Sequence, residues 1–155
     1  LKLAVMLALT TGARRMEIWS LKRNEIDLEN GFATFSKTKT GVARTVPIRG
    51  EALELLRERT TRIDTQLLFP SLKNSSVPFD FRRSFKAALV KAKIADFSWH
   101  DLRHSAASYL IRSGVNLRIA GEILGHKNIS MTMKYSHLAP DHLTDAVEKM
   151  TKKFL

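Results

Sequence analysis

The sequence contains no cysteine and only two tyrosines in 155 residues. The absence of cysteine excludes a disulfide framework, a thiolate metal site and a cysteine nucleophile, and it fits a reducing compartment such as the cytoplasm. Long hydrophobic runs are also lacking. The apolar opening LKLAVMLAL covers only residues 1–9 and is followed by TTGARR instead of a small-residue cleavage site. We therefore expect a buried helix there, with no signal peptide and no membrane span.

Acidic residues are scarce compared with basic ones. There are 15 Asp and Glu against 26 Lys and Arg, which gives a formal net charge of +11. Such an excess favours a polyanionic partner, with nucleic acid the first candidate, over an acidic small molecule. A solvated basic face is the alternative that charge alone leaves open.

The length and the 44% hydrophobic content suit one domain with a real core, so we take residues 1–155 as a single domain. The chain opens at Leu1 inside an apolar helix. It is therefore interpreted as a piece of a longer protein whose N-terminal module is absent from this sequence.

The apolar periodicity is mostly helical and predicts a mainly α fold with a small antiparallel β-hairpin or sheet, an α+β class. The hairpin is predicted from FATFS (32–36) and ARTVPI (43–48), which flank the lysine-rich tip KTKTG. Helices are predicted at 1–9, 14–22, 51–61, 80–93, 99–112, 116–124, in a segment capped by Asn128 that carries Tyr135, and at 140–152.

The motif HDLRH (100–104) has two readings that involve chemistry. His100 and His104 have the spacing of the zinc pair of H-E-x-x-H metalloproteases, but Asp101 stands where those enzymes carry their glutamate, and no third ligand is apparent. In the second reading, His100 and Arg103 lie one helical turn apart and bind a phosphate. A solvated helix start is the remaining alternative.

The segment TGARRMEIWSL (11–21) places two arginines side by side. On a helix, Arg14 and Arg15 point about 100° apart, so we expect at most one of them to serve a site. Taken alone, the segment is more typical of a solvated face on which Glu17 pairs with Arg14.

Lys37 and Lys39 lie in the predicted hairpin. Either they are ordinary turn lysines, or one ammonium reaches a phosphate and donates a proton to a leaving oxygen.

The two tyrosines are predicted to differ in role. Tyr109 lies among apolar helical neighbours in SAASYLIRSG and is predicted to be a core tyrosine with its hydroxyl near the surface. Tyr135 follows the LGH loop that contains His126. As a nucleophile, its phenol needs a base or a strong positive field, because its reference pKa is about 10.

The ordered set TGARRMEI, KTG, HDLRH, LGH and then Tyr135 resembles the catalytic domain of the tyrosine recombinases, the phage integrase family. The resemblance extends from Thr11 to His137, and the order is far more specific than any single motif. It implies a mostly helical catalytic domain that clamps duplex DNA together with a separate N-terminal core-binding domain.

The resemblance also implies a catalytic set. Arg14 and Arg103 match the two catalytic arginines, His100 and His126 match the two other basic positions, and Tyr135 matches the nucleophile. Glu17 matches the acidic residue that usually follows the first arginine, whereas Met16 departs from the small polar residue often found there. Lys39 is taken as the catalytic lysine, with Lys37 as the reserve.

The activity implied is strand cleavage and rejoining through a 3′-phosphotyrosine, without metal or other cofactor. His100 would handle the phenol proton, and Lys39 would protonate the leaving oxygen. A type IB topoisomerase and a noncatalytic DNA-binding regulator are the alternatives. The expected partners are double-stranded DNA, further protomers on that DNA and accessory DNA-bending proteins, in a cytoplasmic, nucleoid-associated setting of a bacterium or phage. The segment 140–155 is expected to dock onto a neighbouring protomer.

Overall fold

The computed structural model describes residues 1–36, 41, 43–59, 64–139, 147–148 and 150–152. Lys37 and Lys39, and with them the predicted tip of the hairpin, lie outside these residues. The α-helices are α1 (Lys2–Thr11), α2 (Arg15–Trp19), α3 (Glu51–Arg57), α4 (Arg82–Lys91), α5 (Trp99–Arg112), α6 (Leu117–Leu124) and α7 (Ser130–Met133). Two short 3₁₀ helices are η1 (Arg23–Glu25) and η2 (Ser136–Leu138). No helix within this part of the chain is long and apolar enough to cross a membrane.

The predicted hairpin forms two strands of a three-stranded antiparallel sheet, so the expected mainly α fold with a small antiparallel β element is confirmed. β2 (Phe32–Phe35) pairs with β3 (Arg44–Pro47) as expected, with Ala33 opposite Val46. The third strand, β1 (Ile26–Asp27), pairs with β2 on its other side. Because β1 has only two residues, it carries no alternation that a sequence pattern could reveal.

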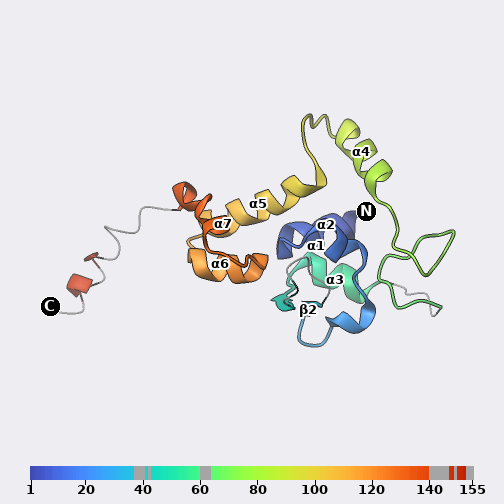
Figure 1. The fold of residues 1–155 in the computed structure, drawn as a ribbon, viewed down its shortest axis with the longest axis horizontal. Coiled ribbons are helices and arrows are strands. Elements are labelled where there is room, and N and C mark those ends of the chain that lie inside the picture. Colours follow the sequence, from blue (N-terminus) through green and yellow to red (C-terminus); the bar gives the residue numbers. More distant parts are fainter. Residues whose placement is uncertain (37–40, 42, 60–63, 140–146, 149, 153–155) are drawn as a thin grey trace.

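The apolar helix α1 lies in the middle of the fold, packed against α2, α3 and α5. In Figure 1, α5 extends from the side of α4 towards α6 and α7, so this one helix connects the N-terminal and C-terminal parts of the domain. The prediction of a buried first helix is confirmed.

An aromatic cluster joins three helix ends. Trp19 at the end of α2, Phe81 just before α4 and Trp99 at the start of α5 contact one another, with ring centroids 5.6–6.0 Å apart. Such pairs add roughly 0.5–1.5 kcal/mol each beyond the area they bury. The cluster fixes the start of α5, and therefore HDLRH, relative to the helix that follows TGAR.

The predicted helix starts at α5 and α6 are confirmed in detail. The Ser98 backbone N–H donates to the Asp101 carboxylate at 2.7 Å, as in a capping box. The Ser98 hydroxyl donates to the same carboxylate at 2.6 Å. The Asn116 side chain accepts a hydrogen bond from the Arg118 backbone N–H at 2.8 Å, and α6 ends at Gly125 in the left-handed conformation.

Two predictions about the tyrosines' surroundings are wrong. Tyr135 is not carried on a helix but lies in the turn between α7, which ends at Met133, and η2, which begins at Ser136. Tyr109 is not a core residue, because 69% of it is exposed. Its position falls on the outer face of α5, which no described element covers at that point.

Candidate active site

The TG turn between α1 and α2 brings two catalytic candidates together. Gly12 ends α1 with φ of 60°, and a Cβ on it would come within 2.4 Å of the Leu124 side chain, so the turn needs glycine. The Gly12 carbonyl accepts a hydrogen bond from Arg103 Nη1 at 2.6 Å. Two residues later, Arg14 stands at the start of α2. The turn therefore positions Arg14 directly and Arg103 through its backbone.

Glu17 is a buried carboxylate held by two arginines. It accepts hydrogen bonds from the Arg14 backbone N–H at 2.7 Å and from the Arg14 guanidinium at 3.1 Å. The Arg44 guanidinium donates two more, at 2.7 and 3.1 Å. Burial acts to raise the pKa of Glu17, but hydrogen bonds from Arg44 and Arg14 outweigh it and hold this pKa below its usual value. The predicted pairing of Glu17 with Arg14 is confirmed. The expectation that this pair lies on a solvated face is wrong, because Glu17 is buried.

Arg103 is buried with part of its hydrogen-bonding capacity unused. Only 6% of the residue is exposed, and its Nη2 has no hydrogen-bond partner among the described residues. Burial, together with repulsion from Arg14 and Arg44, lowers the pKa of Arg103 to about 10. A buried guanidinium with a spare N–H group is suited to an additional anionic acceptor.

The LGH loop brings His126 to the same place. Gly125 follows α6 with φ of 67°, and a Cβ there would come within 2.9 Å of the Arg44 side chain. Arg14 Nη2 donates to the Gly125 carbonyl at 3.4 Å, and Arg44 Nε donates to the Ile123 carbonyl at 3.0 Å. Both arginines thus attach the loop to the Glu17 carboxylate.

His126 is oriented by a buried threonine. Its Nδ1 lies 2.8 Å from the hydroxyl oxygen of Thr132, a residue that is fully buried in α7. Burial and the positive charges of Arg103 and Arg14 lower the pKa of His126 to about 4. The imidazole is therefore neutral near pH 7, and Nε2 is the nitrogen left for a ligand.

Tyr135 meets a histidine other than the one that the resemblance implied. His104 Nδ1 lies 2.5 Å from the Tyr135 hydroxyl oxygen. The His100 ring contacts the His104 ring edge-to-face, with centroids 4.8 Å apart. Burial raises the pKa of the Tyr135 phenol, while the Arg103 charge acts in the opposite direction. The role of His100 at the phenol proton stays a prediction.

The cluster carries more positive than negative charge. Its buried or half-buried guanidinium groups belong to Arg14, Arg44 and Arg103, and Glu17 is the carboxylate that pairs with Arg14 and Arg44. The pKa values of Arg103 and His126 are lowered first by burial and then by this excess of positive charge. A phosphate-sized anion beside Arg14, Arg103 and His126 would relieve the repulsion, and Tyr135 approaches the same group of charges.

Three residues of this arrangement were missed from the sequence as site residues. Arg44 was considered only as part of a strand, and Thr132 gives no sequence signal of its own. His104 was weighed only as a zinc ligand. Among the described residues no group of three or more His, Asp or Glu side chains could hold a metal ion. Of the predicted site residues, Arg14, Glu17, His100, Arg103, His126 and Tyr135 converge on one region, and Lys39 is outside the described chain.

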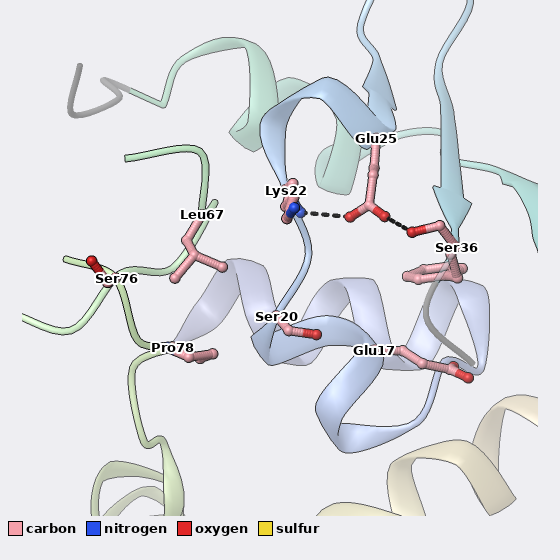
Figure 2. Close-up of a pocket in the computed structure, with 9 residues that line it drawn as sticks. Glu17, Ser20, Lys22, Glu25, Ser36, Leu67, Ser76 and Pro78 are labelled. Atoms are coloured by element: carbon pink, nitrogen blue, oxygen red, sulfur yellow. Dashed lines mark hydrogen bonds between the residues drawn. The ribbon is translucent and has the colours of Figure 1, made fainter. Parts of the chain in front are cut away.

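A pocket of about 220 Å³ lies among α2, η1, the end of β2 and the loop of residues 64–78 (Figure 2). Its wall includes Glu25, which accepts hydrogen bonds from the Lys22 backbone N–H at 2.9 Å and from the Ser36 hydroxyl. Glu17 also lines this pocket, and in Figure 2 its carboxylate points away from Ser20 and Pro78. The pocket therefore borders the charged cluster at Glu17.

Comparison with known proteins shows the family of the chain. The model of the phage integrase family matches residues 1–142. The integrase of Salmonella phage P22 is 32% identical over 99% of this chain and 43% of its own length. Tyrosine recombinase XerA of Pyrococcus furiosus is 35% identical over 96% of this chain and 54% of its own. The chain thus spans about half the length of these curated relatives.

Solved structures show the same fold. The catalytic domain of bacteriophage HP1 integrase superposes with a TM-score of 0.72 at 35% identity, covering 94% of this chain and 79% of that domain. The XerH recombinase bound to its difH substrate superposes with a TM-score of 0.74 at 26% identity, covering 94% of this chain and 45% of that one. The chain belongs to the phage integrase family and has the fold of the tyrosine recombinase catalytic domain.

Proposed function

We propose that this chain is the catalytic part of a site-specific DNA recombinase that cleaves and rejoins strands through Tyr135. The observation that carries the proposal is the excess positive charge around Arg103, whose Nη2 has no hydrogen-bond partner in the part of the chain that the structure describes. With its neighbours Arg14 and His126, this guanidinium would bind an anion beside Tyr135. The names of the relatives, integrases and tyrosine recombinases, support recombination over the other two functions that the sequence left open.

The chemistry requires an anion-stabilising site and a nucleophile. The Tyr135 oxygen attacks a DNA phosphorus, a tyrosyl phosphodiester forms at the 3′ end, and the bond to the 5′ oxygen breaks. Arg14, Arg103 and His126 Nε2 donate hydrogen bonds to the nonbridging oxygens as charge accumulates there. Loss of one such donor typically costs about 3 to 4 kcal/mol in the transition state. The covalent link stores the bond energy, so a partner strand's 5′-hydroxyl can reverse the step.

Duplex DNA is the proposed substrate. The formal net charge of +11 favours a phosphate backbone as partner. The structure of XerH, which shares this fold, contains its difH DNA substrate. Both observations support DNA as the phosphate source for the Arg103 site, and neither specifies a target sequence.

The proposal is tested with a pool of nicked duplexes whose central segment is randomised. Cleavage near the nick releases a short fragment, which prevents religation and traps the covalent complex. We expect a protein–DNA adduct on a denaturing gel, with a free 5′-hydroxyl on the released fragment and no effect of EDTA. Absence of any adduct, or cleavage that EDTA abolishes and zinc restores, would contradict the proposal.

We further propose Lys39 as the general acid that protonates the leaving 5′ oxygen. Lys39→Ala is expected to cleave ordinary phosphodiesters about 10²- to 10⁴-fold more slowly, yet to cleave a 5′-bridging phosphorothiolate at nearly the unmodified rate, because a thiolate leaves without a proton. The measurement compares adduct formation on the two linkages, with Lys37→Ala as the matched control. If Lys39→Ala slowed adduct formation equally on both linkages, Lys39 would not be the general acid. If the phosphorothiolate restored the rate of Lys37→Ala and not of Lys39→Ala, Lys37 would be the general acid.

We also propose that the C-terminal segment 140–155 docks onto another protomer when the protein assembles on DNA. Val147 and Met150, both more than half exposed, supply apolar surface for such a contact. Deleting residues 140–155 is expected to leave binding to single DNA sites intact and to weaken cooperative binding to paired sites in gel-shift titrations. Unchanged cooperativity, or a deletion variant that circular dichroism shows to be unfolded, would favour packing within the same domain.

A further inference from the structure

His104 is the histidine that reaches the hydroxyl of Tyr135. Its Nδ1 lies 2.5 Å from the phenol oxygen, and the two ring centroids are 6.1 Å apart. The pair joins residues 31 positions apart in the sequence, on α5 and in the turn after α7. Because η2 packs against α5, the backbone that follows Tyr135 helps to hold this contact in place.

The other two candidate imidazoles are placed differently. His126 directs its Nδ1 at the Thr132 hydroxyl. His100 contacts the His104 ring. Among these three histidines, His104 makes the hydrogen bond to the Tyr135 oxygen in the described part of the chain.

The phenol needs a proton acceptor. Its ordinary pKa of 10.0 is raised further by burial, so the nucleophile is protonated near neutral pH. The Arg103 charge favours the phenolate but does not outweigh burial. A neutral imidazole at hydrogen-bonding distance has both the geometry and the proton affinity that general base catalysis requires.

We propose that His104 takes the proton from the Tyr135 phenol during strand cleavage and returns it during rejoining, a catalytic role that rests on the proposed function. As the Tyr135 oxygen bonds to phosphorus, its proton moves to the lone pair on His104 Nδ1, and the imidazole becomes an imidazolium. The electron pair of the broken P–O bond stays on the 5′ oxygen, which Lys39 protonates. When a 5′-hydroxyl attacks in reverse, its proton returns to the Lys39 amine, and the imidazolium protonates the departing phenolate.

The proposal assigns a definite tautomer to His104. To accept the phenol proton, Nδ1 must be unprotonated and Nε2 must carry the hydrogen. A histidine that only positions the tyrosine would instead donate an Nδ1–H to the phenol oxygen. ¹⁵N NMR of the histidine side chains distinguishes the two without any DNA, with the His104 signal assigned by its loss in His104→Gln.

We expect His104 Nδ1 to have the ¹⁵N chemical shift of an unprotonated nitrogen. This chemical shift should change in Tyr135→Phe. A protonated Nδ1 in neutral His104, or a signal that Tyr135→Phe leaves unchanged, would overturn the role. The result does not depend on whether the DNA pool contains a good target.

The kinetic test measures the rate of adduct formation against pH on the nicked duplex pool. His104→Gln keeps a hydrogen-bonding side chain of similar reach but cannot take up a proton. We expect a rate about 10²- to 10⁴-fold lower, with the inflection caused by histidine titration removed. His100→Gln is the comparison variant and should slow cleavage while retaining the inflection. His137→Gln, an exposed histidine near Tyr135, should behave like the unmodified chain.

Neighbouring charges have to be separated from His104 itself. Among the described residues, the charged and titratable groups around His104 include His100, Asp101, Asp96, Arg112, Tyr109 and Tyr135. His126 does not produce the inflection, because its pKa is lowered to about 4. An inflection that survives in His104→Gln and disappears in His100→Gln would assign the proton to His100 and overturn the inference. Absence of adduct from the unmodified chain would instead contradict the proposed function.

Discussion

Replacing Tyr135 by phenylalanine is expected to eliminate the covalent protein–DNA adduct and to leave DNA binding nearly unchanged. The substitution removes one oxygen, whose hydrogen bond is to the side chain of His104 on the surface of α5. The charged cluster of Arg14, Glu17, Arg44 and Arg103 does not involve that oxygen. Gel-shift titration should therefore give a similar dissociation constant, while a denaturing gel should show no adduct.

Tyr109→Phe is the matched control, because it removes the chain's other tyrosine hydroxyl. Tyr109 is 69% exposed and lies on the outer face of α5. Adduct formation should proceed normally in this variant. If Tyr135→Phe still formed the adduct and Tyr109→Phe did not, the nucleophile would be Tyr109.

Glu17→Gln is expected to lower the free energy of unfolding by about 3 to 5 kcal/mol, the usual cost of breaking a buried ion pair from one side. The glutamine would leave Arg14 and Arg44 beside Arg103 without a compensating carboxylate. Urea denaturation followed by tryptophan fluorescence measures the change directly. An effect below about 1 kcal/mol would mean that the carboxylate does not hold the arginines together.

Glu122→Gln is the control for the Glu17 prediction. Glu122 pairs with Arg118 on the surface of α6, with side chains 69% and 85% exposed, so its loss should cost about 0.5 kcal/mol or less.

The effect of Glu17→Gln should also depend on pH. Because folding lowers the pKa of Glu17, its ionisation stabilises the fold above the usual value of 4.5, and this contribution is lost as pH falls through the folded-state pKa. The free energies of unfolding of the unmodified chain and of Glu17→Gln should therefore converge as the pH falls.

The elements that depend on local signals were predictable from the sequence. The Ser98 to Asp101 capping box and the Asn116 cap each involve residues close in the chain, so their patterns indicate where α5 and α6 begin. The same applies to the pairing of Arg14 with Glu17, which are three positions apart. The convergence of Arg14, His100, Arg103, His126 and Tyr135 was predictable only through the family resemblance, because their mutual contacts are long-range.

The features that the sequence did not reveal depend on tertiary contacts. Arg44 lies 27 positions from Glu17, and in a strand an inward-pointing arginine is indistinguishable by pattern from a solvated one. His104 follows Arg103 directly, yet its contact with Tyr135 depends on how the turn after α7 returns to α5. The exposure of Tyr109 was missed because apolar neighbours along a helix do not show which face is covered.

The central claim is that Tyr135 is the nucleophile, and mapping the trapped adduct tests it most directly. The unmodified chain is incubated with the nicked duplex pool, and the covalent complex is digested with nuclease and trypsin. Mass spectrometry then locates the residue that carries the nucleotide. The account predicts a tyrosine-linked 3′-phosphate on the peptide that contains Tyr135. A nucleotide on the peptide that contains Tyr109, or on a serine, lysine or histidine, would contradict it.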